Sequence, residues 1–347
     1  MTAGETVGVS DGGTAGGSAG DMAGETAGDM APGRSCPLRY RYGATALASA
    51  PEVTADTLYV IGGLYGNRRA LDAVEALTRG EAGPARLCFN CDFHWFDTDD
   101  GAHAEINARV LAHDALQGNV EAEFGSPDDA AGCGCAYPED VDAGVVARSN
   151  LIHRQLKATA ARQPARLAQI AALPMFRRYG VGPARVGVVH GDAESLAGWR
   201  FDVAALDAPA ALPWLRQVFQ QAQLDVFAST HTCLPALRTL RRAGRSDAVV
   251  VNNGAAGMPN FRGELTGLCT RIATTPAPAA VLHEQRLVSD AGEVFLALLR
   301  PAYDAPRWQA EFEAQWPPGS AAHQSYFERI TRGPGYTPAQ AGPLRLG

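Results

Sequence analysis

The sequence lacks three features that would direct it to a membrane, a secretion pathway or a nucleic acid. No segment holds the roughly eighteen uninterrupted apolar residues that a membrane-spanning helix needs. Its start has no basic residues followed by an apolar run, so we expect no secretory signal. The formal net charge is −7, whereas a nucleic-acid partner requires a clustered basic surface, so we expect none. A small phosphorylated substrate is compatible with this charge, because a bound metal ion supplies local positive charge.

The seven cysteines are an odd number, which is most simply interpreted as free thiols in a reducing compartment. We therefore expect a cytoplasmic protein. Cys88-x-x-Cys91 and Cys133-Gly-Cys135 together offer the four thiolates of a structural zinc site. Cys88 and Cys91, however, lie in an apolar strand and face opposite sides of it by alternation. Buried thiols for the first pair and a loop feature for the second are the favoured interpretation.

Large apolar residues are almost absent from the first 34 positions, which hold mainly Gly, Ala, Thr, Asp and Glu. Such a composition has little to bury, so it predicts a disordered tail over 1–34. Hydrophobic residues make up 46% of the whole chain and charged residues 19%, which is typical of a globular protein. No linker divides 35–347, so we expect a single domain there, with a cap or insertion around 122–182.

Hydrophobic patterning predicts the order of strands and helices. Short apolar runs that end in glycine or polar residues predict buried strands at 58–63, 86–91, 113–119, 185–191, 224–230 and 248–254. Apolar residues at helical spacing predict helices around 70–77, 145–156, 211–222 and 234–244. The segments 280–288 and 293–300 predict a hairpin, and a last helix carries Trp308, Phe312 and Trp316. This alternation, closed by antiparallel strands, indicates a layered α/β protein with mixed sheets.

Polar groups follow the carboxyl ends of five predicted strands, and groups at such ends converge on one crevice. Aspartate and asparagine oxygens with two imidazole nitrogens suit zinc or another divalent transition metal. Each group alone is more often a turn residue, a helix cap or a structural histidine, and only the ordered set indicates a metal site. The five segments are Gly62-Gly63-Leu64-Tyr65-Gly66-Asn67, Cys91-Asp92-Phe93-His94, Gly118-Asn119-Val120-Glu121, His190-Gly191-Asp192 and Thr230-His231-Thr232-Cys233.

This ordered set resembles the calcineurin-like metallophosphoesterases, particularly their small bacterial branch. The family pattern is Asp-x-His-Gly-Asn, Gly-Asp, Gly-Asn-His-Asp/Glu, a His-Gly strand end and Gly-His-x-His. The resemblance spans roughly residues 57–259 and includes Asn-Asn-Gly-Ala-Ala-Gly-Met-Pro at 252–259, similar to the family's Asn-Pro-Gly-Ser turn. It implies a four-layer α/β/β/α sandwich, in which two mixed β-sheets are flanked by helices.

Position by position, the resemblance implies one complete metal position. Asp92 matches the bridging carboxylate, and Asn119, His190 and His231 match the other ligands of that position. The implied activity is hydrolysis of a phosphoester, monoester or diester, by metal-activated water. The implied cofactor is at least one manganese, iron or zinc ion.

The second metal position departs from the family pattern at three ligands. The family's Asp-x-His is Gly63-x-Tyr65 here, and the second histidine of Gly-His-x-His is Cys233. Val120 stands where the family's Gly-Asn-His often provides the proton for the leaving group. Tyr65 is expected to fill vacated space or to hydrogen-bond a substrate oxygen. Cys233 is open to two interpretations: a ligand for zinc or a softer metal, or an inert small residue.

His94 follows the bridging carboxylate in Asp92-Phe93-His94, where it is open to two roles. With its near-neutral pKa it can serve as a general acid or a substitute ligand, or it can be a hydrogen-bonded loop histidine. The candidate catalytic residues are Asp92, His94 and Asn119, and the candidate metal ligands are Asp92, Asn119, His190, His231 and Cys233. The alternatives to a hydrolase are a degenerate metal-binding or regulatory module and a metal-dependent enzyme with changed chemistry.

Overall fold

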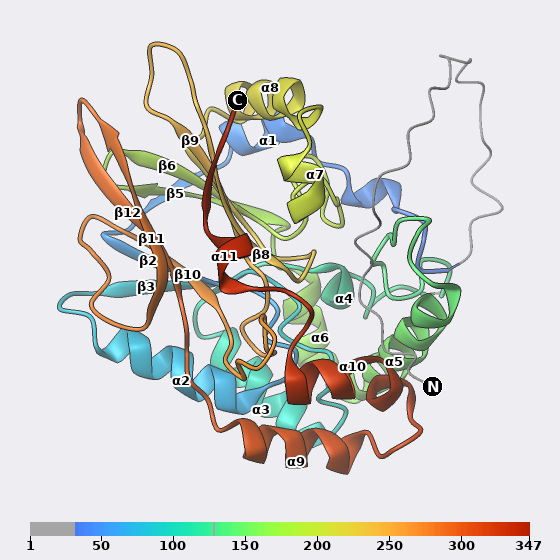
Figure 1. Ribbon diagram of the computed structural model, residues 1–347. Coiled ribbons are helices and arrows are strands. Elements are labelled where there is room, and N and C mark those ends of the chain that lie inside the picture. Colours follow the sequence, from blue (N-terminus) through green and yellow to red (C-terminus); the bar gives the residue numbers. More distant parts are fainter. Residues whose placement is uncertain (1–31, 128) are drawn as a thin grey trace, which may run out of the picture.

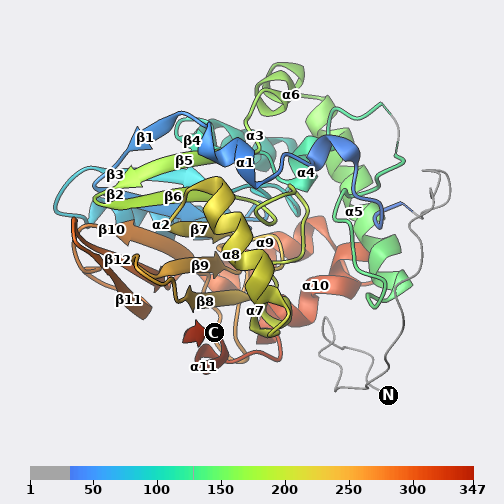
Figure 2. The same cartoon turned by 90° about the horizontal axis from the view of Figure 1, so that it is seen from above.

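Two β-sheets lie face to face in the computed structural model, with helices on both outer sides (Figure 1). The structure describes residues 32–127 and 129–347. Figure 2 shows the sheets as two adjacent central layers. No helix among the described residues combines the length and the apolar character needed to cross a membrane.

The first sheet mixes parallel and antiparallel pairs. Strands β2, β3 and β4 are parallel, and β10, β12 and β11 continue the sheet in antiparallel order. In the described part of the chain this sheet has six strands, in the order β11 (Val281–Ser289), β12 (Gly292–Leu299), β10 (Cys269–Ala273), β2 (Thr57–Ile61), β3 (Ala85–Phe89) and β4 (Asp114–Ala115).

The second sheet is also mixed. Strands β6, β7 and β9 are parallel, β8 runs antiparallel to β9, and β5 and β6 form an antiparallel pair. Over the described residues it has seven strands, in the order β1 (Glu52–Thr54), β5 (Phe176–Val181), β6 (Ala184–Val189), β7 (Val226–Ser229), β9 (Ala248–Asn253), β8 (Pro235–Leu240) and β13 (Pro343–Leu346).

The hydrophobic core lies in three layers. The layer between the sheets takes side chains from both of them, among them Leu58 and Val60 of β2 and Val186 and Val188 of β6. Burying such aliphatic side chains stabilises the fold by about 25 cal/mol for each Å² of apolar surface removed from water. The other two layers lie between each sheet and its helices. The four-layer sandwich that the sequence predicted is confirmed.

Helices cover each outer face and one end of the sandwich (Figure 1). The predicted helices over 70–77, 145–156 and 211–222 and the one with Trp308 and Phe312 are all present. The six-stranded sheet is covered by α2 (Arg68–Arg79), α3 (Asp100–Val110) and α9 (Ala305–Gln315), and the other sheet by α1 (Ala44–Ala48), α7 (Val203–Asp207) and α8 (Ala211–Ala222). The remaining helical segments are η1 (Leu38–Tyr40), α4 (Asn119–Ala122), α5 (Ala143–Ala161), α6 (Pro164–Ala171), α10 (Ala321–Arg332) and α11 (Pro338–Ala341).

Two predicted elements differ from the structure. The helix expected around 234–244 is wrong, because this segment forms strand β8 and pairs with β9 across a turn. Its apolar residues match helical spacing, but the pairing with β9 satisfies the backbone and buries Leu237 and Leu240. The strand expected over 113–119 is only the two-residue β4, since Gly118 already caps α4.

The predicted tail lies mostly outside the described residues, which begin at position 32. Gly33 and Arg34, assigned to that tail, are hydrogen-bonded: Gly33 exchanges backbone bonds with Ala131 and Tyr137, and the Arg34 guanidinium donates to backbone carbonyl groups near position 140. Within the segment expected as an insertion, 122–182, helices α5 and α6 lie outside the sheets, whereas β5 pairs with β1 and β6 inside one.

Candidate metal centre

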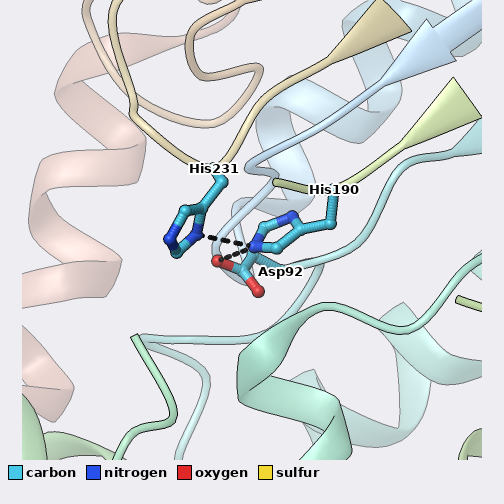
Figure 3. A group of neighbouring side chains, drawn as sticks. All are labelled: Asp92, His190 and His231. Atoms are coloured by element: carbon cyan, nitrogen blue, oxygen red, sulfur yellow. Dashed lines mark hydrogen bonds and ion pairs between the residues drawn. The ribbon is translucent and has the colours of Figure 1, made fainter. Parts of the chain in front are cut away.

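The carboxyl ends of strands from both sheets bring four predicted ligands to one place. Asp92 follows β3 and Asn119 opens α4 after β4, and both strands belong to the six-stranded sheet. His190 directly follows β6 and His231 lies two residues beyond β7, in the other sheet. Figure 3 shows Asp92, His190 and His231 pointing toward one another. The site therefore lies where the strand ends of the two sheets meet.

His190 Nε2 is the centre of this group. It lies 2.8 Å from Asn119 Oδ1, 3.0 Å from His231 Nδ1 and 3.5 Å from Asp92 Oδ2. Among the described residues, Asp92, His190 and His231 form a group whose candidate ligand atoms all lie within 4.8 Å of one another. His190 is fully buried, and Asp92 and His231 are each 6% exposed.

These contacts fit a bound cation better than a hydrogen-bond network. An imidazole nitrogen carries at most one hydrogen, so His190 Nε2 cannot satisfy three polar neighbours at once. Asp92 Oδ1 is buried and has no hydrogen-bond partner among the described residues. Burial, together with the charge that His231 would carry, lowers the pKa of His190 well below its usual value, and burial lowers the pKa of His231 to about 4. Both rings are then neutral, the form that binds a divalent metal.

A buried carboxylate holds the two loops that carry the oxygen ligands. Glu121 accepts backbone N–H groups from Asp92 (3.0 Å), His94 (3.2 Å) and Gly118 (3.0 Å). Burial and the neighbouring Glu121 charge raise the pKa of Asp92, an effect that a divalent cation opposes. Sequence reasoning noted Glu121 but gave it no role, although a glutamate three residues after a helix cap is a known signature.

The backbone at the site is tightly constrained. Asp92 has a φ of 43°, in the left-handed region that aspartate enters more easily than most residues. A Cβ at position 118 would lie 2.2 Å from Asp92 Oδ1 and 2.7 Å from Cys91 Cβ. Only glycine at 118 therefore allows the loop after β4 to approach the carboxylate so closely.

The segment around 131–137 closes over the site and orients the amide ligand. Asn119 Nδ2 donates to the carbonyl of Cys133 at 2.9 Å, which leaves Asn119 Oδ1 facing His190. The expectation of free thiols is wrong for Cys133 and Cys135, which form a disulfide across Gly134, a residue with a φ of 68°. Cys88 and Cys91 are free and buried in the layer between the sheets, so the four cysteines do not form a zinc site.

The altered half of the site is filled by two side chains in direct contact. The Tyr65 hydroxyl lies 2.8 Å from Cys233 Sγ. A Cβ at Gly63, which has a φ of 64°, would come within 2.9–3.0 Å of the Tyr65 ring and hydroxyl. Tyr65 thus occupies space next to the position where the family has its aspartate. Cys233 Sγ is not part of the Asp92, His190 and His231 group.

His94 is buried away from open solvent and both of its ring nitrogens have partners. Nδ1 lies 2.5 Å from Asp97 Oδ2, Nε2 lies 3.0 Å from Asn107 Oδ1, and the ring stacks on His103 with 3.9 Å between centroids. Burial alone would lower the pKa of His94, but the Asp97 carboxylate raises it. This geometry matches the hydrogen-bonded loop histidine among the two expected roles. The catalytic role stays a prediction.

Trp199 is a site residue for which the sequence offered no signal. Its ring lies edge-on to His231 with 5.0 Å between centroids, and its Nε1 donates to the carbonyl of Cys135 at 3.0 Å. It links the loop after β6 to the segment that covers the metal ligands. Its neighbours come from distant parts of the chain, so only the folded arrangement shows the contact.

Neither family models nor curated proteins gave a match to this chain. Similar solved structures include a metallophosphoesterase from Sphaerobacter thermophilus, with 18% identity, a TM-score of 0.49 and coverage of 80% of this chain and 99% of that chain. A hypothetical protein from Pyrococcus horikoshii has 12% identity, a TM-score of 0.49 and coverage of 82% and 100%. Vps29 from Entamoeba histolytica, complexed with zinc, has 13% identity, a TM-score of 0.30 and coverage of 71% and 99%.

Proposed function

We propose that this chain is a metal-dependent phosphoester hydrolase that holds one divalent ion through Asp92, Asn119, His190 and His231. The observation that carries the proposal is the convergence of three other candidate ligand atoms on His190 Nε2, at 2.8, 3.0 and 3.5 Å. Two nitrogens and two oxygens are a ligand set for manganese, iron or zinc. The proposed substrate is a small phosphorylated molecule, and the proposed location is the cytoplasm.

The residues at this site have different proposed roles in holding the ion and positioning its ligands. When bound, a divalent ion there would polarise a phosphoryl oxygen and lower the pKa of water. Asp92 supplies the negative charge that holds the ion, while Asn119 adds a neutral oxygen whose direction is set by the Cys133 carbonyl. Glu121 keeps the Asp92 loop in place through three backbone hydrogen bonds. Trp199 and the segment around 131–137 restrict access of water to the ligands.

The altered half of the site favours a second candidate, a metal-binding module without hydrolytic activity. Tyr65 and Cys233 fill that half, so the symmetric pair of ions that clamps the attacking and leaving oxygens is not available there. Hydrolysis must then proceed with one ion, or the retained position must serve binding alone. Activity measurements on metal-loaded protein separate these candidates.

The proposal is tested by removing ligands and measuring both metal and activity. In Asp92→Asn and His190→Ala we expect most of the bound metal to be lost, together with hydrolysis of generic phosphomonoesters and phosphodiesters, because the first variant removes the negative charge of the site and the second removes an imidazole ligand. The matched control is His113→Ala, since His113 is exposed and lies outside the site. Unchanged metal content in both ligand variants would refute the ligand assignment. Metal binding without hydrolysis in the wild type would support the binding module instead.

A further inference from the structure

One arginine reaches the altered half of the site from the C-terminal part of the chain. Arg329 of α10 donates from Nη2 to the carbonyl of Cys233 at 2.8 Å and from Nε to the carbonyl of Pro259 at 3.3 Å. Cys233 is two residues beyond the ligand His231 and contacts Tyr65 through its sulfur. The guanidinium group therefore lies at the edge of the position where the family holds its second ion.

Arg329 has no carboxylate partner among the described residues, whereas several other arginines that contact the folded core have one. Arg271 pairs with Glu81, Arg238 with Asp207, and even the exposed Arg332 on the same helix pairs with Glu328. Arg329 is half-buried, and a partly desolvated cation without an anion is costly. A guanidinium has five N–H donors, and the two contacts to carbonyl oxygens leave three of them for another acceptor.

Tyr303 and Tyr326 lie close enough to Arg329 for its positive charge to oppose the rise in pKa that burial causes in both. Tyr303 precedes α9 and Tyr326 lies on α10 with Arg329, so the guanidinium lies near hydroxyl groups from two segments. Tyrosine hydroxyls and a guanidinium are suited to bind the oxygens of a phosphoryl group.

We propose that Arg329 binds a nonbridging phosphoryl oxygen of the substrate and supplies, at the edge of the altered half of the site, the positive charge that a second metal ion provides in a two-metal centre. A fixed guanidinium stabilises negative charge on the phosphoryl oxygens. Unlike a second metal ion, it needs no protein ligands at that position. This inference rests on the proposed function, because it assigns to that site an ester substrate held between one ion and one arginine.

A purely structural role is the competing explanation, because the two hydrogen bonds from Arg329 also hold the loop that carries Cys233. The two roles differ in their dependence on charge. Arg329→Gln keeps hydrogen-bonding capacity and removes the charge, whereas Arg329→Lys keeps the charge and loses the bidentate geometry. Arg332→Gln is the matched control, because Arg332 lies on the same helix and its side chain is 77% exposed.

The experiment measures binding of inorganic phosphate to the metal-loaded chain by titration calorimetry, with metal content determined on the same samples. We expect Arg329→Gln to weaken phosphate binding on the order of ten- to a hundred-fold, the loss of a charge-assisted hydrogen bond, with metal content unchanged. Arg329→Lys should recover part of this loss, and Arg332→Gln should bind as the wild type does. For hydrolysed esters, Arg329→Gln should raise KM and lower kcat.

Phosphate binding that is unchanged in Arg329→Gln at full metal content overturns the inference, even if the chain is an active hydrolase. Arg329-dependent phosphate binding without hydrolysis of any ester would instead contradict the proposed function and leave the anion site standing. If Arg329→Gln does not fold or does not bind metal, the inference is tested on the wild-type protein by chemical protection. Phosphate must then protect Arg329, and not Arg332, from modification by phenylglyoxal, and a lack of protection overturns the inference.

Discussion

At the scale of single residues, the site combines one retained position with one that is physically filled. Asp92, Asn119, His190 and His231 meet around one nitrogen. Tyr65 and Cys233 contact each other instead, and both have positive φ values, 55° and 61°. Such conformations are strained for residues other than glycine, so the surrounding structure must hold them. The two departures from the family's Asp-x-His pattern, Gly63 and Tyr65, are therefore sterically linked. A side chain at 63 and the Tyr65 ring would compete for the same space.

This linkage predicts a strong coupling between substitutions at 63 and 65. Gly63→Asp alone should destabilise the chain, because its Cβ would lie 2.9 Å from the Tyr65 ring and because φ is positive there. In Gly63→Asp/Tyr65→His the phenol ring is replaced by the smaller imidazole, so the loss of stability should be smaller than the sum of the single losses by roughly 1–2 kcal/mol. Chemical denaturation of the four proteins of this cycle measures the coupling. Additive losses would show that Tyr65 does not occupy the space of the missing aspartate.

At the scale of secondary-structure elements, the strand ends were the most informative part of the sequence. The strands β2, β3, β6, β7 and β9 are short apolar runs that end in or are followed by glycine or polar residues, and each lies where patterning predicts it. The four proposed ligands could be named from these strand ends together with the resemblance to the metallophosphoesterases. The position of each follows from a local feature, the point at which a buried strand ends.

Other features could not be predicted from the sequence, because they depend on contacts between residues far apart in the chain. Strand β8 was predicted as a helix, because its strand conformation depends on its pairing with β9 and β13. The disulfide between Cys133 and Cys135 and the contact of Trp199 with His231 depend on how the segment after α4 folds back over the site. Arg329 lies nearly a hundred residues from Cys233 in the chain, and no spacing rule connects them.

The turn after helix α2 is joined to the six-stranded sheet by a buried ion pair that predicts a pH dependence of stability. Glu81 receives two hydrogen bonds from Arg271 of β10, at 2.6 and 2.9 Å, and one from the hydroxyl of Tyr59 at 2.6 Å. Burial raises the pKa of Glu81, but the bonds from Arg271 and Tyr59 outweigh it and lower the pKa below its usual value. The stabilisation is therefore complete above the usual carboxyl range and is lost as pH falls through the folded-state pKa.

We expect Glu81→Gln to lower the free energy of unfolding by about 3 kcal/mol at neutral pH, because it leaves the buried Arg271 charge without a counterion. The difference from the wild type should shrink as pH is lowered toward the folded-state pKa of Glu81. Glu293→Gln is the control, because its partner Arg286 and Glu293 itself are 59% and 43% exposed. Thermal unfolding across a range of pH values measures both. A deficit in Glu81→Gln that does not vary with pH would contradict this account.

At the scale of the whole molecule, the site depends on both sheets and on the C-terminal helices at once. Asn253 of β9 donates to the carbonyls of Gly62 and Leu268 at 3.0 Å each, which joins the seven-stranded sheet to loops of the other sheet beside the site. Helix α10 packs on α5, where Arg148 Nε donates to Ser325 Oγ at 2.7 Å, and the same helix carries Arg329. The proposed metal ligands and the proposed anion-binding arginine are thus positioned by parts of the chain that assemble only in the complete fold.

The metal-to-protein ratio of the purified full-length chain tests this account most directly. Elemental analysis after loading with manganese, iron or zinc and removal of free ions should give about one ion per chain, because one position is complete and Tyr65 and Cys233 fill the other. Asp92→Asn should reduce this ratio toward zero, and the triple variant Gly63→Asp/Tyr65→His/Cys233→His should raise it toward two. Two ions per wild-type chain would contradict the account, because Tyr65 or Cys233 would then be ligands of a second ion.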